Sequence, residues 1–155
     1  YYPALNPNKW VYLSTLGMIG TGVPVACAAK IAYPDDQVFL FTGDGSFGFN
    51  GMEYDTAVRH DLPFVGIMGN DGVWGIDYHI QMGLYQRPVA TELRQSRYDQ
   101  IVQALGGHGE LVSHPDQLES AVKRSLESGL PSLINVTTKP AISALAAASI
   151  LRNKG

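Results

Sequence analysis

The chain has 155 residues, of which 45% are hydrophobic and 16% charged, a composition that can bury a core and argues against a disordered segment. Its 11 basic and 14 acidic residues give a formal charge of −3 without long runs of one sign, so neither nucleic acid nor a membrane is an expected partner. The single cysteine, Cys27, cannot form an internal disulfide, and a cytoplasmic protein is predicted. The apolar run at residues 141–151 is shorter than the roughly 20 residues that span a bilayer.

Helices and strands are predicted to alternate along the chain. Helices are expected at residues 22–32, 51–60, 98–105 and 115–128, the last capped by Ser113 and ended by Gly129. Short apolar runs bounded by glycine, proline or aspartate predict buried strands at residues 38–42, 64–69, 110–112 and 133–137. This alternation predicts an α/β fold, a doubly wound parallel sheet with helices on both faces.

Two segments fall outside that alternation. Residues 74–94 contain Gly75, Gly83 and Pro88 and are predicted to form an irregular ligand loop beside the carboxyl edge of the sheet. The alanine-rich tail, residues 140–155, ends in Arg152 and Lys154 and is predicted to form a short amphipathic or docking helix. The expected organisation is one domain at residues 1–139, followed by a tail that could act as an active-site lid.

A glycine-rich turn follows the predicted strand at residues 38–42. The order of strand, glycine turn (residues 43–48) and helix favours a phosphate ligand, because glycines let backbone N–H groups approach an anion closely. Asp44 lies in the same turn and would repel a phosphate. Mg²⁺ between the two groups removes this conflict, since it binds a few protein oxygens together with phosphate oxygens.

Asn70 follows the next predicted strand and is expected at the same carboxyl edge as Asp44. Its side chain is predicted to supply a second oxygen to the metal. The backbone at Asp71 and Gly72 could offer a carbonyl as a third ligand.

A rival interpretation of the glycines is an NAD-binding Rossmann domain. Gly43-x-Gly45-x-x-Gly48 satisfies the dinucleotide fingerprint, and Asp71 stands about where a ribose-binding acid would be. Asp44 argues against this alternative, because a carboxylate would face a metal-free pyrophosphate.

The spacing of these residues resembles a known cofactor motif. Gly43-Asp44-Gly45, followed by 24 residues and then Asn70, is similar to the motif of thiamine-diphosphate-dependent enzymes, in their C-terminal diphosphate-binding domain. By that resemblance, Asp44, the Asn70 side chain and the Gly72 carbonyl would bind Mg²⁺. Gly43, Gly45 and Ser46 would lie against the diphosphate of the cofactor.

A second segment extends the resemblance. Residues 16–24 look like the segment that holds the aminopyrimidine in the acetolactate synthase and pyruvate decarboxylase superfamily. Gly17 would offer its carbonyl to the exocyclic amine of thiamine diphosphate, and Ile19 would be the bulky residue that bends the cofactor.

The resemblance implies an enzyme that makes or breaks a carbon–carbon bond next to a carbonyl. Residues 47–53 look close to oxalyl-CoA decarboxylases and 2-hydroxyacyl-CoA lyases, while Trp74-Gly75 looks more like benzaldehyde lyase, and an acetolactate-synthase-like carboligase remains an alternative. Trp74, Tyr78 and His79 are candidates for the lining of a substrate pocket.

The family places its catalytic glutamate on a pyrimidine-binding domain, normally supplied by another subunit. No residue of this chain matches that glutamate, so the chain alone is predicted to be inactive and to belong to a homodimer or homotetramer. We also expect it to lack the first strand and helix of the usual domain. The substrate would be a small molecule or an acyl-CoA.

Overall fold

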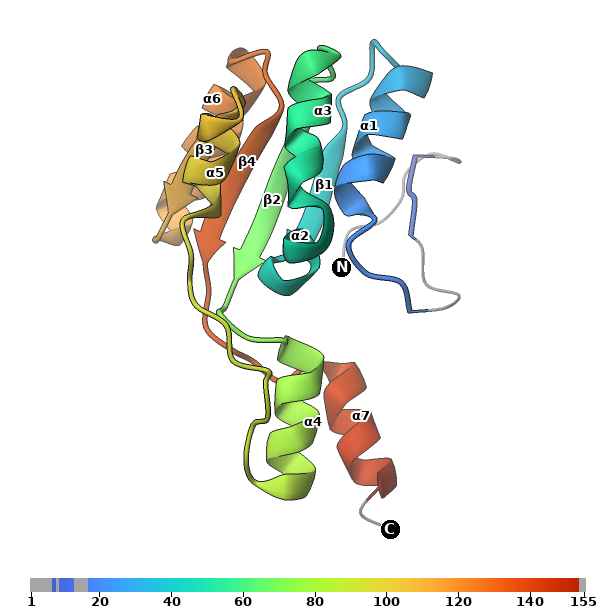
Figure 1. The fold of residues 1–155 in the computed structure, drawn as a ribbon, viewed down its shortest axis with the longest axis vertical. Helices are drawn as coiled ribbons and strands as arrows, with labels where there is room; N and C mark the ends of the chain where they lie inside the picture. The colour runs from blue at the N-terminus through green and yellow to red at the C-terminus, as the bar shows by residue number, and fades with distance from the viewer. Residues whose placement is uncertain (1–6, 8, 13–16, 154–155) are drawn as a thin grey trace.

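A computed structural model of the chain describes residues 7, 9–12 and 17–153 (Figure 1). Within them, four parallel strands form one sheet in the order β1-β2-β4-β3. The strands are β1 (Phe39–Gly43), β2 (Val65–Asn70), β3 (His108–Val112) and β4 (Ser132–Thr137). Each lies within two residues of its predicted bounds, and the parallel pairing confirms the predicted α/β fold.

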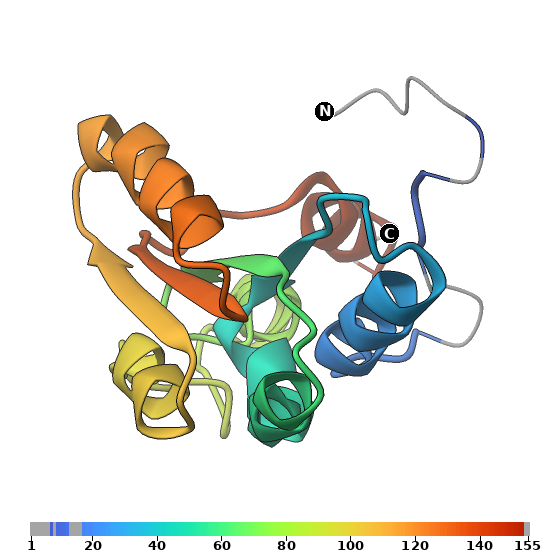
Figure 2. The same ribbon diagram turned by 90° about the horizontal axis from the view of Figure 1, so that it is seen from above.

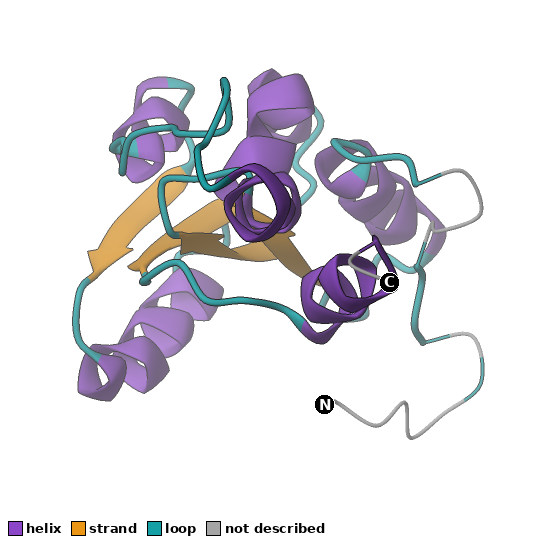
Figure 3. Ribbon diagram, turned by 90° about the horizontal axis from the view of Figure 1, so that it is seen from below, coloured by secondary structure: helices purple, strands orange, loops and turns teal. Residues whose placement is uncertain are grey.

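Helices cover both faces of the sheet (Figures 2 and 3). One face carries α1 (Gly22–Ala32), α2 (Asp44–Asn50), the short 3₁₀ turn η1 (Gly51–Glu53), α3 (Tyr54–Arg59) and α5 (Tyr98–Ala104). The other face carries α6 (Leu118–Glu127), which follows the 3₁₀ turn η2 (Pro115–Gln117). The helix predicted at residues 22–32 is observed with the same bounds.

The larger core lies between the sheet and the first group of helices. Tyr54, Phe64, Met68, Val102 and Leu133 are nearly or fully buried there and belong to one cluster. A second cluster of Val65, Val112, Ala121 and Ile134 packs under α6. Successive residues of β2 and β4 point alternately into the two cores. Both faces of these strands are therefore buried, which explains why their sequences are continuous apolar runs.

Three local predictions were wrong. A turn was expected at residues 43–48, but α2 begins at Asp44, directly after β1, because Gly43 serves as its extended N-cap. Ser113 was expected to cap the helix predicted at residues 115–128, but His114 is the N-cap of η2. The Gln117 side chain accepts the backbone N–H groups of Ser113 and His114.

The third correction concerns residues 74–94, which contain the helix α4 (Gly75–Tyr85) instead of an irregular loop. Ile76, Ile80 and Leu84 recur at helical spacing, a pattern that Gly75 precedes and Gly83 interrupts. Gly83 permits close packing of the tail, because a Cβ there would lie 2.6 Å from Cδ1 of Ile150.

The tail forms the predicted helix, α7 (Ala144–Asn153), which packs against α4. Figure 1 shows both helices beyond the carboxyl ends of the strands. Lys154 lies outside the described residues. In the described part of the chain, no helix is long and apolar enough to cross a bilayer.

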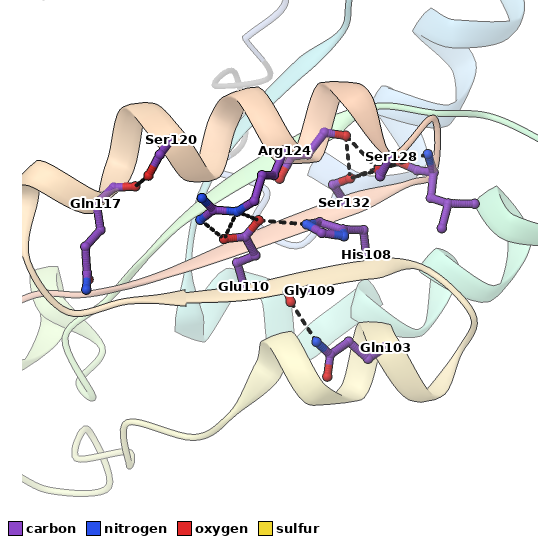
Figure 4. A network of polar contacts seen from close by, with 11 residues as sticks. Gln103, His108, Gly109, Glu110, Gln117, Ser120, Arg124, Ser128 and Ser132 are labelled. Carbon is purple, nitrogen blue, oxygen red and sulfur yellow. Dashed lines mark hydrogen bonds and ion pairs between the residues drawn. The ribbon is translucent and has the colours of Figure 1, made fainter.

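A network of hydrogen bonds and ion pairs joins the edge strand β3 to α6. Figure 4 shows Glu110 of β3 between His108 and Arg124. Glu110 Oε1 accepts from His108 Nε2 at 2.8 Å and from Arg124 Nε at 3.0 Å, and Oε2 accepts from the same guanidinium. Burial raises the pKa of Glu110, but the hydrogen bonds from Arg124 and His108 outweigh it and lower that pKa below its ordinary value of 4.5.

Candidate functional site

Asp44 and Asn70 both lie at the carboxyl edge of the sheet, the location that the sequence predicted. Gly43 at the end of β1 pairs with Gly69 of β2, so Asp44, the first residue of α2, and Asn70, the last residue of β2, follow at neighbouring strand ends. Both side chains are buried, with 3% of Asp44 and 1% of Asn70 exposed. Asp44 Oδ2 accepts the backbone N–H of Gly72 at 3.0 Å, which ties the turn after β2 to the start of α2.

The Asp44 carboxylate is in an environment that disfavours its charge. Burial raises its pKa above the ordinary value of 3.8, and the nearby charge of Asp71 acts in the same direction. The N–H group of Gly72 opposes this effect in part. A bound cation would offset both unfavourable contributions, because it would neutralise a buried carboxylate that has no cationic partner among the described residues.

The Asn70 amide is satisfied on one side only. Its Nδ2 donates to the Ser96 carbonyl and to Asn135 Oδ1, both at 3.0 Å. Its Oδ1 is buried and has no hydrogen-bond partner among the described residues. Since buried carbonyl oxygens are almost always paired, this atom is suited to accept a ligand that the polypeptide does not supply.

Gly72 has a backbone conformation with φ of +72°, which glycine adopts without strain. Its carbonyl, the predicted third metal ligand, accepts the N–H of Leu93 at 2.7 Å. A carbonyl oxygen has two lone pairs, so one acceptor position remains for a metal. No group of three or more histidine, cysteine, aspartate or glutamate residues forms a metal site in the described chain. A metal at this edge would therefore depend on amide and carbonyl oxygens besides Asp44.

Gly45 lies beneath the indole of Trp74. A Cβ at Gly45 would stand 2.8 Å from the indole ring, so the close approach requires glycine. Trp74 also packs edge-on against Phe49, with ring centroids 5.8 Å apart. Of the three residues proposed for a substrate pocket, Trp74 is thus adjacent to the start of α2.

Ser46 and Asn50 hold the segment predicted to contact the aminopyrimidine. Ser46 Oγ accepts the N–H of Gly20 at 2.9 Å, and Asn50 Nδ2 donates to the Gly20 carbonyl at 3.0 Å. The turn that contains Gly17 and Ile19 is thereby brought beside α2. Gly17 has φ of +62° and is exposed, and 49% of Ile19 is exposed, while Leu16 lies outside the described residues.

Tyr78 and His79 lie on α4 with their rings edge to face. His79 Nε2 is buried without a hydrogen-bond partner among the described residues. The pocket role of both residues stays a prediction.

The sequence did not identify the residues that support Asn70. Asn135 of β4 is fully buried and donates from Nδ2 to the Ser96 carbonyl and to Asp99 Oδ1. Asp99 in turn pairs with Arg97, with 2.6 Å between Oδ2 and Nη2. The available signal was Asn135 itself, a polar residue in the middle of the apolar run of β4.

A cavity of about 160 Å³ lies at the opposite end of the sheet, near the first residues of β1 and β2. Val38, Phe64, Ser125 and Leu130 are among its lining residues. It does not include the carboxyl edge, so the hollow and the cluster around Asn70 are separate features.

The fold defines a doubly wound α/β domain, a class that binds ligands at the carboxyl edge of its sheet. At that edge lie a buried carboxylate and an amide oxygen that no described residue pairs with. Residues 1–136 match the family model described as "Thiamine pyrophosphate enzyme, C-terminal TPP binding domain". The chain belongs to this family. Family membership sets aside the NAD-binding alternative for the glycine motif.

Relatives of known name agree with the family. The chain is 49% identical over 137 residues to the acetolactate synthase large subunit of Mycobacterium tuberculosis, covering 88% of the chain and 25% of the relative. It is 40% identical over 107 residues to 2-hydroxyacyl-CoA lyase 2 of Caenorhabditis elegans, covering 69% of the chain and 17% of the relative. The chain thus spans about a quarter or less of the length of these relatives.

A solved structure has the same fold. The thiamine-diphosphate-dependent 4-hydroxybenzoylformate decarboxylase of Rhodococcus jostii RHA1 superposes with a TM-score of 0.71 at 25% identity. The match covers 81% of this chain and 24% of that one.

Proposed function

We propose that this chain binds the diphosphate of thiamine diphosphate through Mg²⁺ in an enzyme that makes or breaks a carbon–carbon bond next to a carbonyl. The observation that carries the proposal is the buried Asn70 Oδ1, which has no partner among the described residues and lies at the same edge as the buried Asp44. An oxygen-lined site of this kind suits Mg²⁺, a cation that prefers oxygen ligands and keeps positions for phosphate and water.

In this proposal, Asp44, Asn70 Oδ1 and the Gly72 carbonyl hold the metal. The first N–H groups of α2 have no partner within the helix and can donate to phosphate oxygens. The diphosphate therefore lies against Gly43, Gly45 and Ser46. Gly45 carries no side chain that would fill the space beneath Trp74. Ser46 accepts a hydrogen bond from Gly20, which leaves its hydroxyl proton available to a phosphate oxygen.

Gly17 and Ile19 are proposed to contact the aminopyrimidine end of the cofactor. The exposure of Ile19, at 49%, leaves an apolar side chain available for such a contact. When bound, thiamine diphosphate supplies the electron sink for bond making or breaking at the carbonyl carbon. The contribution of this chain is to anchor and orient that group.

The substrate class is proposed in two forms. A 2-hydroxyacyl-CoA lyase or oxalyl-CoA decarboxylase-like activity is favoured by residues 47–53, and relatives named 2-hydroxyacyl-CoA lyase at 38–40% identity support it. An acetolactate-synthase-like carboligase is supported by the relatives at 49% identity, and benzaldehyde-lyase-like chemistry is a further form of that alternative. Trp74, Tyr78 and His79 are proposed to line the substrate pocket, with α7 as a lid.

The partner we propose is the pyrimidine-binding domain of the same enzyme, contributed by another subunit of a cytoplasmic homodimer or homotetramer. Phe41 of β1, 58% exposed, and Leu145 of α7, 62% exposed, support a domain that is covered in a larger assembly. The chain alone would then be inactive, because the catalytic glutamate belongs to that partner domain.

Titration of the intact protein with thiamine diphosphate tests the cofactor proposal. We expect binding in Mg²⁺ and little binding in a chelator. Asp44→Ala and Asn70→Ala should each weaken Mg²⁺-dependent binding by about 100-fold or more, while circular dichroism stays that of the wild type. Glu110→Gln is the matched control, because it alters a polar network away from the site. Equal affinity with and without Mg²⁺ would refute the metal bridge.

Steady-state kinetics distinguish the two substrate classes. Turnover of a 2-hydroxyacyl-CoA, compared with condensation of pyruvate, assigns the enzyme to one class. Removal of the chain after Lys139 should raise the KM for acyl-CoA substrates and leave small 2-keto acids unaffected if the basic end of the tail meets the CoA phosphates. An unchanged KM for every acyl-CoA tested would favour the acetolactate-synthase-like alternative.

A further inference from the structure

Asn70 can present an oxygen to a cation only if its amide is held in one of two orientations. The two ends of an asparagine amide are nearly equal in size, so packing alone does not distinguish them. Hydrogen-bond partners must therefore decide which end faces the unpaired side. The contacts around Asn70 provide such a decision.

The hydrogen bonds that orient Asn70 form a series, called the relay below, which begins at the acceptor Asp99. An ionised carboxylate only accepts hydrogen bonds, so the group of Asn135 that faces Asp99 Oδ1 at 2.9 Å must be its NH₂. This leaves Asn135 Oδ1 facing Asn70, whose Nδ2 donates to it at 3.0 Å. The Asn70 oxygen is then directed to the opposite side, where it has no partner among the described residues.

The Ser96 carbonyl enforces the same order. It accepts from Nδ2 of Asn70 and from Nδ2 of Asn135, each at 3.0 Å. A reversed amide at either position would place two oxygens against each other in a site where both side chains are at most 1% exposed. Such a contact is strongly unfavourable, because neither buried oxygen recovers the hydrogen bonds it would make in water.

Arg97 maintains the charge at the start of this series. Its Nε lies 3.1 Å from both oxygens of Asp99, and its Nη2 donates to Oδ2 at 2.6 Å. Asp99 is 1% exposed. Burial raises the pKa of this carboxyl, but the hydrogen bonds from Arg97 and Asn135 outweigh it and lower that pKa.

We infer that Asp99 and Asn135 are positioning residues that fix the Asn70 amide with its oxygen toward the metal site. Arg97 keeps Asp99 as the ionised carboxylate that this orientation requires. The inference rests on the proposed Mg²⁺ site. In this account the three residues do not bind the metal or the cofactor themselves, and they act through the orientation of the Asn70 amide.

Asp99→Asn tests this relay with a side chain of the same shape. Arg97 takes the single remaining oxygen, so the new NH₂ faces Asn135 and favours reversal of both following amides. Calorimetry on the intact protein should show Mg²⁺-dependent thiamine diphosphate binding weakened at least about 10-fold, the range seen when a group that orients a metal ligand is lost. Wild-type affinity in this variant would overturn the inference.

The double variant Asp99→Asn with Asn135→Asp supplies the rescue. A carboxylate at position 135 accepts from the new amide at position 99 and from Asn70 Nδ2, so the Asn70 oxygen again faces the site. We expect only part of the lost affinity to return, since the second oxygen of that carboxylate would face the Ser96 carbonyl, which in the wild type accepts from Asn135 Nδ2 at 3.0 Å. A purely structural role would give no recovery. No recovery would count against the relay. Tyr54→Phe is the matched control, because it removes a buried 3.1 Å hydrogen bond to Ser132 on the same sheet without touching the series.

Neutron diffraction from deuterated crystals of the unmodified protein tests the orientation without any variant. Deuterium should appear on the Asn135 atom that faces Asp99 and on the Asn70 atom that faces Asn135. The reverse placement would overturn the inference even if the cofactor binds as proposed. Absence of Mg²⁺-dependent binding in the wild type would instead refute the proposed function, together with the role of the relay in it.

Discussion

Two polar networks of this domain differ in one respect. Around Glu110, both carboxylate oxygens are occupied by His108 and Arg124, and the network joins β3 to α6 (Figure 4). The Asn70 amide differs, because both N–H groups of its Nδ2 have acceptors, whereas its Oδ1 has no donor among the residues that the structure describes. The first network is complete within the described chain, whereas the second ends at an atom that faces the proposed cofactor.

This difference indicates which of the two networks serves ligand binding and which serves only the stability of the fold. A fold gains little from a buried oxygen without a partner, since that atom loses water and gains nothing in return. Asn70 therefore fits a residue retained for a ligand, whereas Glu110 fits a residue retained for packing a strand against a helix. Four substitutions and one pH series break or sharpen the comparison.

Asn135→Leu should have the largest effect on stability. It removes the partner of Asn70 and of Asp99 and leaves buried polar groups unsatisfied, so the free energy of unfolding should fall by about 2–4 kcal/mol. Urea denaturation measures the loss, and calorimetry should show weaker cofactor binding in the same variant. Loss of stability with unchanged cofactor affinity would make the site network no different from the Glu110 network.

Gly45→Ala should follow, because its Cβ would lie 2.8 Å from the Trp74 ring. Overpacking of this kind costs about 1–3 kcal/mol, and displacement of the indole should change tryptophan fluorescence. Gly48→Ala is the matched control on the same helix, since a Cβ there meets nothing within 4 Å. Equal stability and equal fluorescence of the two variants would show that a methyl group fits between Gly45 and Trp74.

Glu110→Gln should reduce stability by less than Asn135→Leu and leave Mg²⁺-dependent cofactor binding unchanged. The Arg124 guanidinium is half exposed and can be hydrated when its partner loses charge, which limits the loss. Thermal unfolding and calorimetry on the same preparation measure both quantities. A clear drop in cofactor affinity would contradict the separation of the two networks.

The stability difference between the wild type and Glu110→Gln should depend on pH. Because the pKa of Glu110 is lower in the folded chain than its ordinary value of 4.5, its ionised form stabilises the fold above that pH. The contribution is lost as the pH falls through the lowered folded pKa. The two unfolding curves should therefore converge in acid below pH 4.5. If the stability difference between the two proteins instead grew below pH 4.5, the pKa of Glu110 would be raised by folding and not lowered.

Lys123→Gln should have the smallest effect. Its partner Glu119 lies one helical turn away on α6, and both side chains are mostly exposed. Such pairs contribute less than about 0.5 kcal/mol, so urea unfolding should be nearly unchanged. A larger loss would mean that the surface of α6 supports the Glu110 network more than its geometry indicates.

The sequence predicted the sheet from its apolar runs, and it predicted the two side chains at the sheet edge because one strand–helix–strand unit separates Asp44 from Asn70. It failed at α2, whose start at Asp44 depends on the extended conformation of Gly43, and at α4, whose packing with α7 involves residues more than sixty positions apart. Asn135 and Asp99 were missed for the same reason. Their link to Asn70 joins β2, β4 and the segment before α5, and such contacts have no fixed spacing.

The occupant of the Asn70 oxygen can be observed directly. Crystals of the intact protein grown with thiamine diphosphate and Mn²⁺ in place of Mg²⁺ would reveal the metal by its anomalous scattering. The account predicts a peak about 2.1 Å from Asn70 Oδ1 and from an Asp44 carboxylate oxygen, with the diphosphate on its other side. Bound cofactor with the metal elsewhere, or with Asn70 Oδ1 turned away from it, would contradict the account.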